Sequence, residues 1–398
     1  MRTPRLLFDD FFRHVIRIVS MFSLVALVAI ILFVFVQGAD PFLTSTAPSV
    51  RLVAQNISRL EVNGVEYIDR TTFIPLEEGA ERAEINFVNR GEPVSFTVDI
   101  SPHEKDGRKA VLFTGVDEEK ISYPEAYTAS ATWPGLITGL EQSITILLPE
   151  DPYPVLSFLG GMEWRPTHLK LFGILPMILA TILSTILAVA IGVPLALLSA
   201  VFIGEYLPRR IAGPVRAAID LLAGIPSVVY GFFGLMVIVP LVQRLFNAPS
   251  GSSLASAVFI LAVMVLPTIV TITITSIEAV PGSLREASLA VGASSLQTTW
   301  RVVVPAARSG ILAGIILGVS RAIVETMAVI LVAGNSPQLP TSLTDSVRTL
   351  TATIALEMGY AQGRHSQILF SIGIVLFVMI LILNTVVLKL KERLTRGL

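Results

Sequence analysis

Six long apolar segments constrain this chain more than any other feature of its 398 residues. Each is long enough to cross about 30 Å of hydrocarbon as a helix. Because lipid offers the backbone no partners, such segments cross a membrane as helices whose hydrogen bonds are internal. We therefore predict an α-helical polytopic membrane protein with six transmembrane helices. The segments lie near residues 17–38, 172–203, 217–243, 253–275, 309–333 and 366–388.

The composition agrees with a membrane protein and narrows its function. Hydrophobic residues make up 53% of the chain and charged residues only 15%, unlike an ordinary soluble domain. A formal net charge of −1 gives no reason to expect a nucleic-acid partner. There is no cysteine, which excludes disulfides and thiolate metal sites, and the four histidines are scattered without ligand spacing. We expect neither a metal nor another cofactor.

The distribution of arginine and lysine predicts the topology, because loops rich in these residues stay in the cytoplasm. The N-terminus 1–16, the loop after the fourth span and the tail 389–398 are therefore expected inside, and residues 39–170 outside. The first span is too long for a signal-peptide core and no cleavage pattern follows it closely, so we expect it to remain uncleaved. The basic residues are Arg2, Arg5, Arg13, Arg17, Arg209, Arg210, Arg216, Arg285, Arg301, Arg308, Lys389, Lys391, Arg393 and Arg396.

The external region changes character, since apolar and polar residues alternate in short runs from about Val50 to Val116. Asn63-Gly64 between two such runs is a strong hairpin signal. We predict a β-rich insertion over 39–150 with five or six strands, as a sandwich or a barrel, followed by an interfacial segment at 151–171. Its role stays open between docking a partner, contacting the cell envelope and merely occupying space.

A polar loop at 279–309 separates the fourth and fifth spans. Ser283 and Glu286 have the spacing of a capping box, in which each side chain bonds a free backbone N–H of the other. The helix that follows has one modest face of small and apolar residues at helical spacing. That face comprises Leu284, Ala287, Ser288 and Val291.

The same loop predicts a second short helix. Gly292 stands where a first helix can end in a left-handed residue. The next helix can begin at Ser294 or Ser295 and is expected to stop before Pro305. Such a compact helix–turn–helix suits docking into a groove on another protein, and a solvated connector is the alternative.

The third span carries Pro226, next to Gly224, inside an otherwise helical segment. Proline removes a backbone hydrogen bond there, and transporters tolerate such breaks where the freed backbone lines a cavity or is covered by protein. Ser227 and Tyr230 add hydroxyl donors beside the break. An anion would meet N–H and O–H groups at this point without a full charge to trap it. The alternative is a packing kink.

Arg321 and Glu325 lie one helical turn apart in the fifth span, where an unpaired charge costs about 2.5–3.5 kcal/mol. Their spacing would put them on one face, able to pair. Arg321 could offer planar donors to an oxyanion while Glu325 moderates its field. The alternative is an ion pair that orients the helix bundle.

Other polar residues have plainer interpretations. Glu205 and Asp220 are expected to form interfacial salt bridges with nearby arginines. Glu357 lies on an amphipathic external stretch, and Trp164 is expected to anchor the chain at the membrane interface. The arginines near Glu205 and Asp220 are Arg209, Arg210 and Arg216.

The polar loop resembles the EAA motif, the coupling loop of ABC-importer permeases. It departs from that motif at Ser288, where the family has a second alanine, and at Val304, where it usually has leucine. Neither change removes the small face. The matching residues are Glu286, Ala287, Gly292 and Pro305.

Four further strings are similar to the permeases of phosphate-specific ABC transporters, and together with the spans between them they cover most of 155–390. One of them, FLGGMEWRP, resembles the C-type subunit, PstC, rather than its partner type, PstA. The β-rich insertion is outside this family pattern. The strings are FLGGMEWRP (158–166), DLLAGIPSVVYGFFGL (220–235), SRAIVETMAV (320–329) and TATIALEMGYA (351–361).

This resemblance implies the type I ABC-importer permease fold, with a five-helix core at 172–388 in a bacterial inner membrane. It also implies assembly with a PstA-type permease, two ATPase copies and a periplasmic phosphate-binding protein, with phosphate as substrate and membrane lipid around the spans. The residues expected to couple the ATPase are Ser283, Glu286, Ala287, Gly292 and Pro305, and those expected to line the path are Gly224, Pro226, Ser227, Tyr230, Arg321 and Glu325.

The chain carries no GxxxxGK[ST] loop to cradle ATP phosphates, so we expect a transport subunit without an ATPase site of its own. Four alternatives remain. They are a permease for another oxyanion such as sulfate or molybdate, the PstA-type partner subunit, a secondary transporter without an ATPase, and a membrane sensor.

Overall fold

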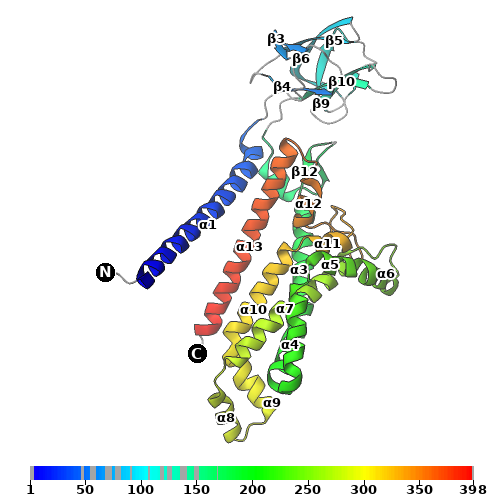
Figure 1. Cartoon of the computed structure of the whole chain (residues 1–398). Coiled ribbons are helices and arrows are strands. Elements are labelled where there is room, and N and C mark those ends of the chain that lie inside the picture. The colour runs from blue at the N-terminus through cyan, green and yellow to red at the C-terminus, as the bar shows by residue number, and fades with distance from the viewer. Residues whose placement is uncertain are drawn as a thin grey trace.

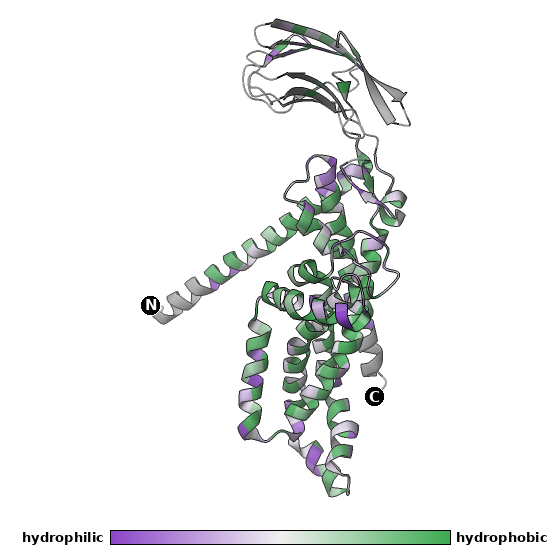
Figure 2. Ribbon diagram, turned by 90° about the vertical axis from the view of Figure 1, so that its right-hand side faces the viewer, coloured by the Kyte–Doolittle hydropathy of each residue, from purple (hydrophilic) through white to green (hydrophobic). Residues whose placement is uncertain are grey.

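The computed structural model describes residues 4–45, 49–53, 60–67, 74–76, 82–89, 92–105, 108–116, 121–122, 128–134, 141–147, 152–167 and 169–396. Six helical segments in these ranges are long and apolar enough to cross a membrane, as the sequence predicts. Figure 2 shows hydrophobic residues along most of their length. The segments are Arg13–Leu43, Leu175–Tyr206, Ser227–Phe246, Leu254–Glu278, Ser295–Val324 and Arg364–Val386.

The centre of the helical bundle is α7 (Leu254–Glu278), the most buried of the six spans. It packs between α3 (Leu175–Val201) and α10 (Val304–Val324). Gly192 of α3 and Gly318 of α10 allow these close approaches, because a Cβ on either would lie 2.7 Å from a side-chain carbon of α7. In membranes, where lipid is as apolar as leucine, small residues at such contacts supply the packing that holds helices together.

Replacing Gly318 with valine is therefore expected to destabilise the bundle. The added atoms would overlap the Ile269 side chain of α7, and overpacking costs about 1–3 kcal/mol. Thermal unfolding of the purified protein in detergent measures the loss. Gly213→Ala is the control, because no atom lies within 4 Å of that Cβ position and alanine favours the helix. Equal unfolding temperatures for Gly318→Val and the wild type would contradict the prediction.

Two of the spans predicted from the sequence are divided in the structure. The prediction of one span over 217–243 is wrong in its first part: α4 (Arg209–Gly224) is a separate helix, and the span begins with α5 (Ser227–Phe233). It continues through the π-helical segment η3 (Gly234–Ile238) and α6 (Val239–Phe246). The predicted span over 309–333 is also divided, because α10 ends at Val324 and α11 (Met327–Val332) follows.

The polar loop forms two helices, α8 (Gly282–Ala290) and α9 (Ser295–Thr298), at one end of the bundle (Figure 1). The expected stop before Pro305 does not occur. From α9 the chain passes through the π-helical segment η4 (Thr299–Val303) directly into α10. Pro305 lies in the first turn of α10, where its missing N–H costs little. A third π-helical segment, η2 (Phe202–Tyr206), follows α3 directly.

The first helix, α1 (Pro4–Leu43), packs against the last helix, α13 (Arg364–Arg396), towards the end of α1 (Figure 1). Phe33 meets Phe370 edge to face. The Ser371 hydroxyl donates to the Gly38 carbonyl over 2.7 Å. Between Val15 and Val36, α1 exposes a long series of apolar side chains.

The β-rich insertion contains two five-stranded antiparallel sheets in its described residues, more strands than predicted. Their orders are β4-β1-β10-β9-β8 and β3-β2-β5-β6-β7, and Figure 2 shows them as two layers, which favours the sandwich. The strands are β1 (Ser49–Val53), β2 (Leu60–Val62), β3 (Val65–Tyr67), β4 (Ile74–Pro75), β5 (Arg82–Asn89), β6 (Glu92–Lys105), β7 (Arg108–Thr114), β8 (Ile121–Ser122), β9 (Thr128–Pro134) and β10 (Glu141–Leu147).

Local sequence explains two features of this sandwich. Asn63 and Gly64 join β2 and β3 with φ of 49° and 80°, the left-handed pair of a two-residue hairpin turn. The first and last strands, β1 and β10, are antiparallel neighbours, with Ser49 opposite Leu147. The chain therefore enters and leaves the sandwich at neighbouring points.

The outer end of the bundle, on the side of the sandwich, is covered by short elements (Figure 1). These elements are α2 (Val155–Gly160), β11 (Trp164–Arg165), β12 (Leu171–Phe172) and α12 (Leu350–Glu357). Two of these elements, β11 and β12, pair as a short hairpin that carries Trp164 and Phe172. Both side chains pack with Phe158, Leu350 and residues of α13 in one buried apolar cluster.

Candidate functional site

The first interruption lies at Ile225 and Pro226, both with extended backbone between α4 and α5. The break leaves carbonyl groups at the end of α4 without helical partners. The Tyr230 hydroxyl, one turn into α5, donates to the Leu222 carbonyl over 2.8 Å. Pro226 and Gly224 remain exposed, with open space beside Gly224. The expected break is therefore present, and one side of it is not covered by this chain.

The second interruption lies at Glu325, whose backbone is extended between α10 and α11. Its carboxylate accepts from the backbone N–H groups of Thr326 at 3.1 Å and Ala328 at 3.2 Å. Its carbonyl accepts from the Thr351 hydroxyl of α12 at 3.0 Å. Glu325 therefore caps the start of α11 and ties this break to the outer helix α12.

Arg321 lies in the last turn of α10 and is half-buried. The expected pairing of Arg321 with Glu325 assumes one continuous helix, and this helix ends at Val324. Among the described residues no ion pair joins the two side chains.

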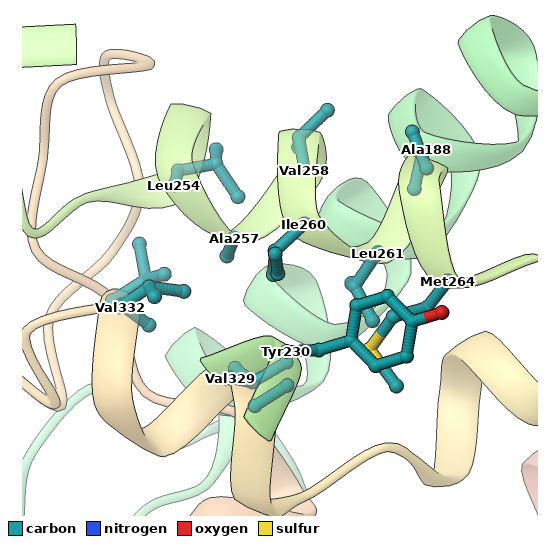
Figure 3. Packing of buried hydrophobic residues seen from close by; sticks show 14 of the residues in the cluster. Ala188, Tyr230, Leu254, Ala257, Val258, Ile260, Leu261, Met264, Val329 and Val332 are labelled. Atoms are coloured by element: carbon teal, nitrogen blue, oxygen red, sulfur yellow. The ribbon is translucent and has the colours of Figure 1, made fainter. Parts of the chain in front are cut away.

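The two interruptions are neighbours because α5 packs directly on α11. A Cβ on Gly231 would lie 2.7 Å from the Cα atom of Ala328, so the backbones nearly touch. Figure 3 shows the Tyr230 ring of α5 beside Leu261 and Met264 of α7, with Val329 of α11 near the base of the same side chain. One arginine, one buried tyrosine and two stretches of non-helical backbone thus gather at one level of the bundle. The Arg321 guanidinium can bind an oxyanion by charge-assisted hydrogen bonds, whereas the one proton of the Tyr230 hydroxyl is donated to the Leu222 carbonyl.

A buried polar cluster at the outer end was missed by sequence reasoning. Glu357 is only 4% exposed. It bonds the Arg348 guanidinium at 2.6 Å, the His365 ring at 2.7 Å and the Trp164 indole N–H at 2.9 Å. The sequence predicts an amphipathic external stretch around Glu357 and an interfacial anchor at Trp164, whereas both side chains are buried in this cluster. The available signal was a single carboxylate among apolar residues in TATIALEMGYA.

The cluster changes the pKa of Glu357. Burial raises it, but hydrogen bonds with His365 and Trp164 and the charge of Arg348 outweigh burial, so the pKa lies below its ordinary value of 4.5. A carboxyl whose folded pKa is lowered stabilises the fold above its unfolded pKa and loses that effect as pH falls through the folded value.

We therefore expect the stability advantage of the wild type over Glu357→Gln to be complete above about pH 4.5 and to shrink as the pH falls further. Thermal unfolding in detergent across pH 3–7 measures it. Other carboxyls titrate in both proteins and cancel in the difference. A difference that stayed constant down to pH 3 would contradict the expectation.

The opposite end of the bundle presents α8 and α9. Gly292 has φ of 87° after α8, as predicted. The capping box predicted for Ser283 and Glu286 is wrong: α8 begins at Gly282, and the N-cap Pro281 makes no side-chain bond. Ser294 and Gln297 form the capping box instead, at the start of α9. No residue of α8 is buried, and the exposed apolar side chains of this end are Leu284, Leu289, Val291, Leu296 and Trp300.

Glu205 and Asp220 bond partners other than those predicted. Glu205 pairs with Arg285 of α8 at 2.7 Å, and Asp220 accepts from the Thr271 hydroxyl of α7 at 3.1 Å. Arg216 of α4 pairs with Glu278 at the end of α7. The helices fold back so that residues distant in sequence meet, whereas the prediction relied on near neighbours.

Six spans, two adjacent helix breaks and an exposed helical pair at one end define a membrane transport subunit of the permease class. Residues 192–398 match the family of binding-protein-dependent transport system inner membrane components. A probable ABC transporter permease protein, YqgH of Bacillus subtilis, is 39% identical over 227 residues, covering 56% of this chain and 74% of that protein. The chain belongs to the binding-protein-dependent transport system inner membrane component family.

Two further similarities stand beside this match. The phosphate transport system permease protein PstC of Mesorhizobium japonicum is 37% identical over 242 residues, covering 56% of this chain and 74% of that protein. A solved inward-facing structure of the MetNI methionine ABC transporter aligns with a TM-score of 0.46 and 15% identity, over 56% of this chain and 95% of that one.

Family membership gives the general role. The chain is a multi-pass inner membrane protein and a transport subunit, not an enzyme. Its family implies a substrate-binding protein and a separate ATPase subunit as partners.

Proposed function

We propose that this chain is the PstC-type permease subunit of an ATP-driven phosphate importer. The observation that carries the proposal is Arg321, a half-buried cation inside the membrane beside two helix breaks. A planar guanidinium suits an oxyanion, and charged residues in spans mark ion paths more often than they serve packing. The similarity to named phosphate permeases supports phosphate as the anion.

The path lies between this chain and a second, PstA-type permease in our proposal. Gly224 and Pro226 are exposed at the first break, and bare backbone is not stable against lipid. A partner subunit would cover that side and complete the conduit. Ser227 and Tyr230 then supply hydroxyls next to Arg321, and Glu325 orders the second break.

The end formed by α8 and α9 faces the cytoplasm in this proposal, together with both termini, and residues 39–170 face the periplasm. The arginine and lysine distribution supports this orientation. The exposed apolar residues around Gly292 suit a groove of an ATPase dimer, with Ser283, Glu286, Ala287 and Pro305 forming the loop that receives its motion. The outer elements would meet the phosphate-binding protein.

The test is uptake of labelled phosphate, sulfate and molybdate into vesicles containing the reconstituted complex, with and without ATP. Phosphate uptake that requires ATP supports the proposal, whereas uptake of sulfate or molybdate instead assigns another oxyanion. Uptake that needs no ATP, unaffected by changes at Glu286 or Gly292, would identify a secondary transporter and overturn the proposal.

A further inference from the structure

Arg285 lies in the middle of the exposed helix α8, yet its side chain enters the base of the bundle. Its Nη2 atom donates to Glu205 Oε1 at 2.7 Å and to the Ile277 carbonyl at 2.9 Å. Its Nη1 atom donates to the Val280 carbonyl at 2.7 Å. The side chain is 25% exposed and that of Glu205 only 13%. One guanidinium therefore holds three acceptors at once.

These acceptors belong to two central helices. Glu205 lies in η2, which continues α3 without a break. Ile277 lies in the last turn of α7, and Val280 follows two residues after the end of that helix. Carbonyls at a helix C-terminus lack the full set of helical partners. Arg285 thus donates hydrogen bonds to carbonyls at the C-terminal end of α7 and, at the same time, to Glu205 in the continuation of α3. Its five N–H donors in a rigid plane make this possible, whereas lysine offers only a point charge.

Another link joins α8 to the helix that follows. The Ser288 and Thr298 hydroxyls are 2.9 Å apart, and Thr298 leads into η4 and α10. α8 and α10 are also joined by the short stretch of chain between them, so a movement of α8 reaches α10 without this hydrogen bond. Residues 279–281 likewise join α7 to α8 along the chain. The tie to α3 has no such short covalent route, and Arg285 provides it through Glu205, 80 residues away in sequence.

We propose that Arg285 is a positioning residue that makes α3 and α7 move together with α8. Motion of a docked ATPase then reaches the two central helices and, through the packing of α7 against α5 and α11, both helix breaks. This rests on the proposed function. It assigns the transmission to an ion pair that the coupling-loop pattern alone does not include.

The experiment uses the complete complex in vesicles, with binding protein and ATPase, and measures phosphate taken up per ATP hydrolysed. Glu205→Gln keeps the side-chain size and removes the negative charge, and Arg285→Gln removes the positive charge together with the guanidinium donors. In both variants we expect ATPase binding and ATP hydrolysis to persist while phosphate uptake per ATP falls at least fivefold. The uptake per ATP of Arg285→Lys should lie between that of the glutamine variants and that of the wild type. Arg210→Gln, an exposed arginine at the same end, is the matched control and should leave the ratio unchanged.

Two outcomes overturn the inference. Uptake per ATP at the wild-type level in both glutamine variants would show that the pair transmits nothing. Loss of ATPase binding in parallel with uptake would show that Arg285 only holds α8 in shape. A wild-type complex that binds no ATPase, or that transports without ATP, would instead contradict the proposed function itself, so the two failures are distinguishable.

A second measurement follows the motion directly. Because the chain has no cysteine, spin labels can be attached at Leu289→Cys in α8 and Thr275→Cys in α7, both at exposed positions. In the wild-type background their separation should stay constant between the ATP-free and ATP-bound complex. In Arg285→Gln it should change on ATP binding. A constant separation in both backgrounds would overturn the inference.

Discussion

Replacing Arg321 with alanine should lower ATP-dependent phosphate uptake by about 10- to 150-fold while the complex still assembles. A hydrogen bond to a charged group contributes about 1.5–3 kcal/mol, and each 1.4 kcal/mol corresponds to tenfold. Arg321 has no ion pair with Glu325 to lose, since the helix ends between them. Its removal therefore takes a donor from the path without leaving an orphaned carboxylate in the membrane.

The measurement is the initial rate of labelled phosphate uptake into vesicles, with subunit stoichiometry checked after purification. Arg321→Lys should recover part of the rate, because it restores the charge but not the planar donors. Arg308→Ala on the same helix is the control for loss of an arginine. Normal uptake by Arg321→Ala would mean that this arginine serves packing, and the substrate would have to pass elsewhere.

Replacing Glu357 with leucine should destabilise the permease by about 3–5 kcal/mol, the usual cost of removing one partner from a buried ion pair. Arg348, His365 and the Trp164 N–H would all lose their shared acceptor. These groups come from three separate parts of the chain, so the outer end would lose its cross-links together. α12 would then be free to withdraw Thr351 from the break at Glu325.

Thermal unfolding in detergent measures this change. Glu163→Leu is a matched control from the same outer segment, because Glu163 pairs with Arg165 where both side chains are more than half exposed. Exposed pairs contribute about 0–1 kcal/mol. Similar losses in both variants would show that Glu357 matters only as a surface charge.

Much of this fold is predictable because its signals are local. Apolar length predicts the six spans, Asn63-Gly64 predicts its hairpin, and Gly292 predicts the left-handed end of α8. Pro226 predicts a break because the missing N–H acts on its own helix. In each case the deciding interaction lies within a few residues.

The failures share a different cause. Glu325 ends a helix without proline or glycine beside it, because its own carboxylate caps the next one. Glu357 bonds Trp164, 193 residues away in sequence, and Arg285 bonds Glu205, 80 residues away. Periodicity and spacing carry no information on such pairs. The polar cluster around Glu357 and the contacts of Arg285 could therefore be found only in the three-dimensional structure. The prediction that the helix stops before Pro305 is wrong because the π-helical segment η4 precedes this residue and accommodates the proline ring.

The neighbouring ends of the β-sandwich have a consequence for the history of this protein. Because Ser49 and Leu147 are paired across adjacent strands, the whole module can be removed and the gap closed by a few residues. A gene could have acquired it by a single insertion between the first two spans, with no change in how the helices pack.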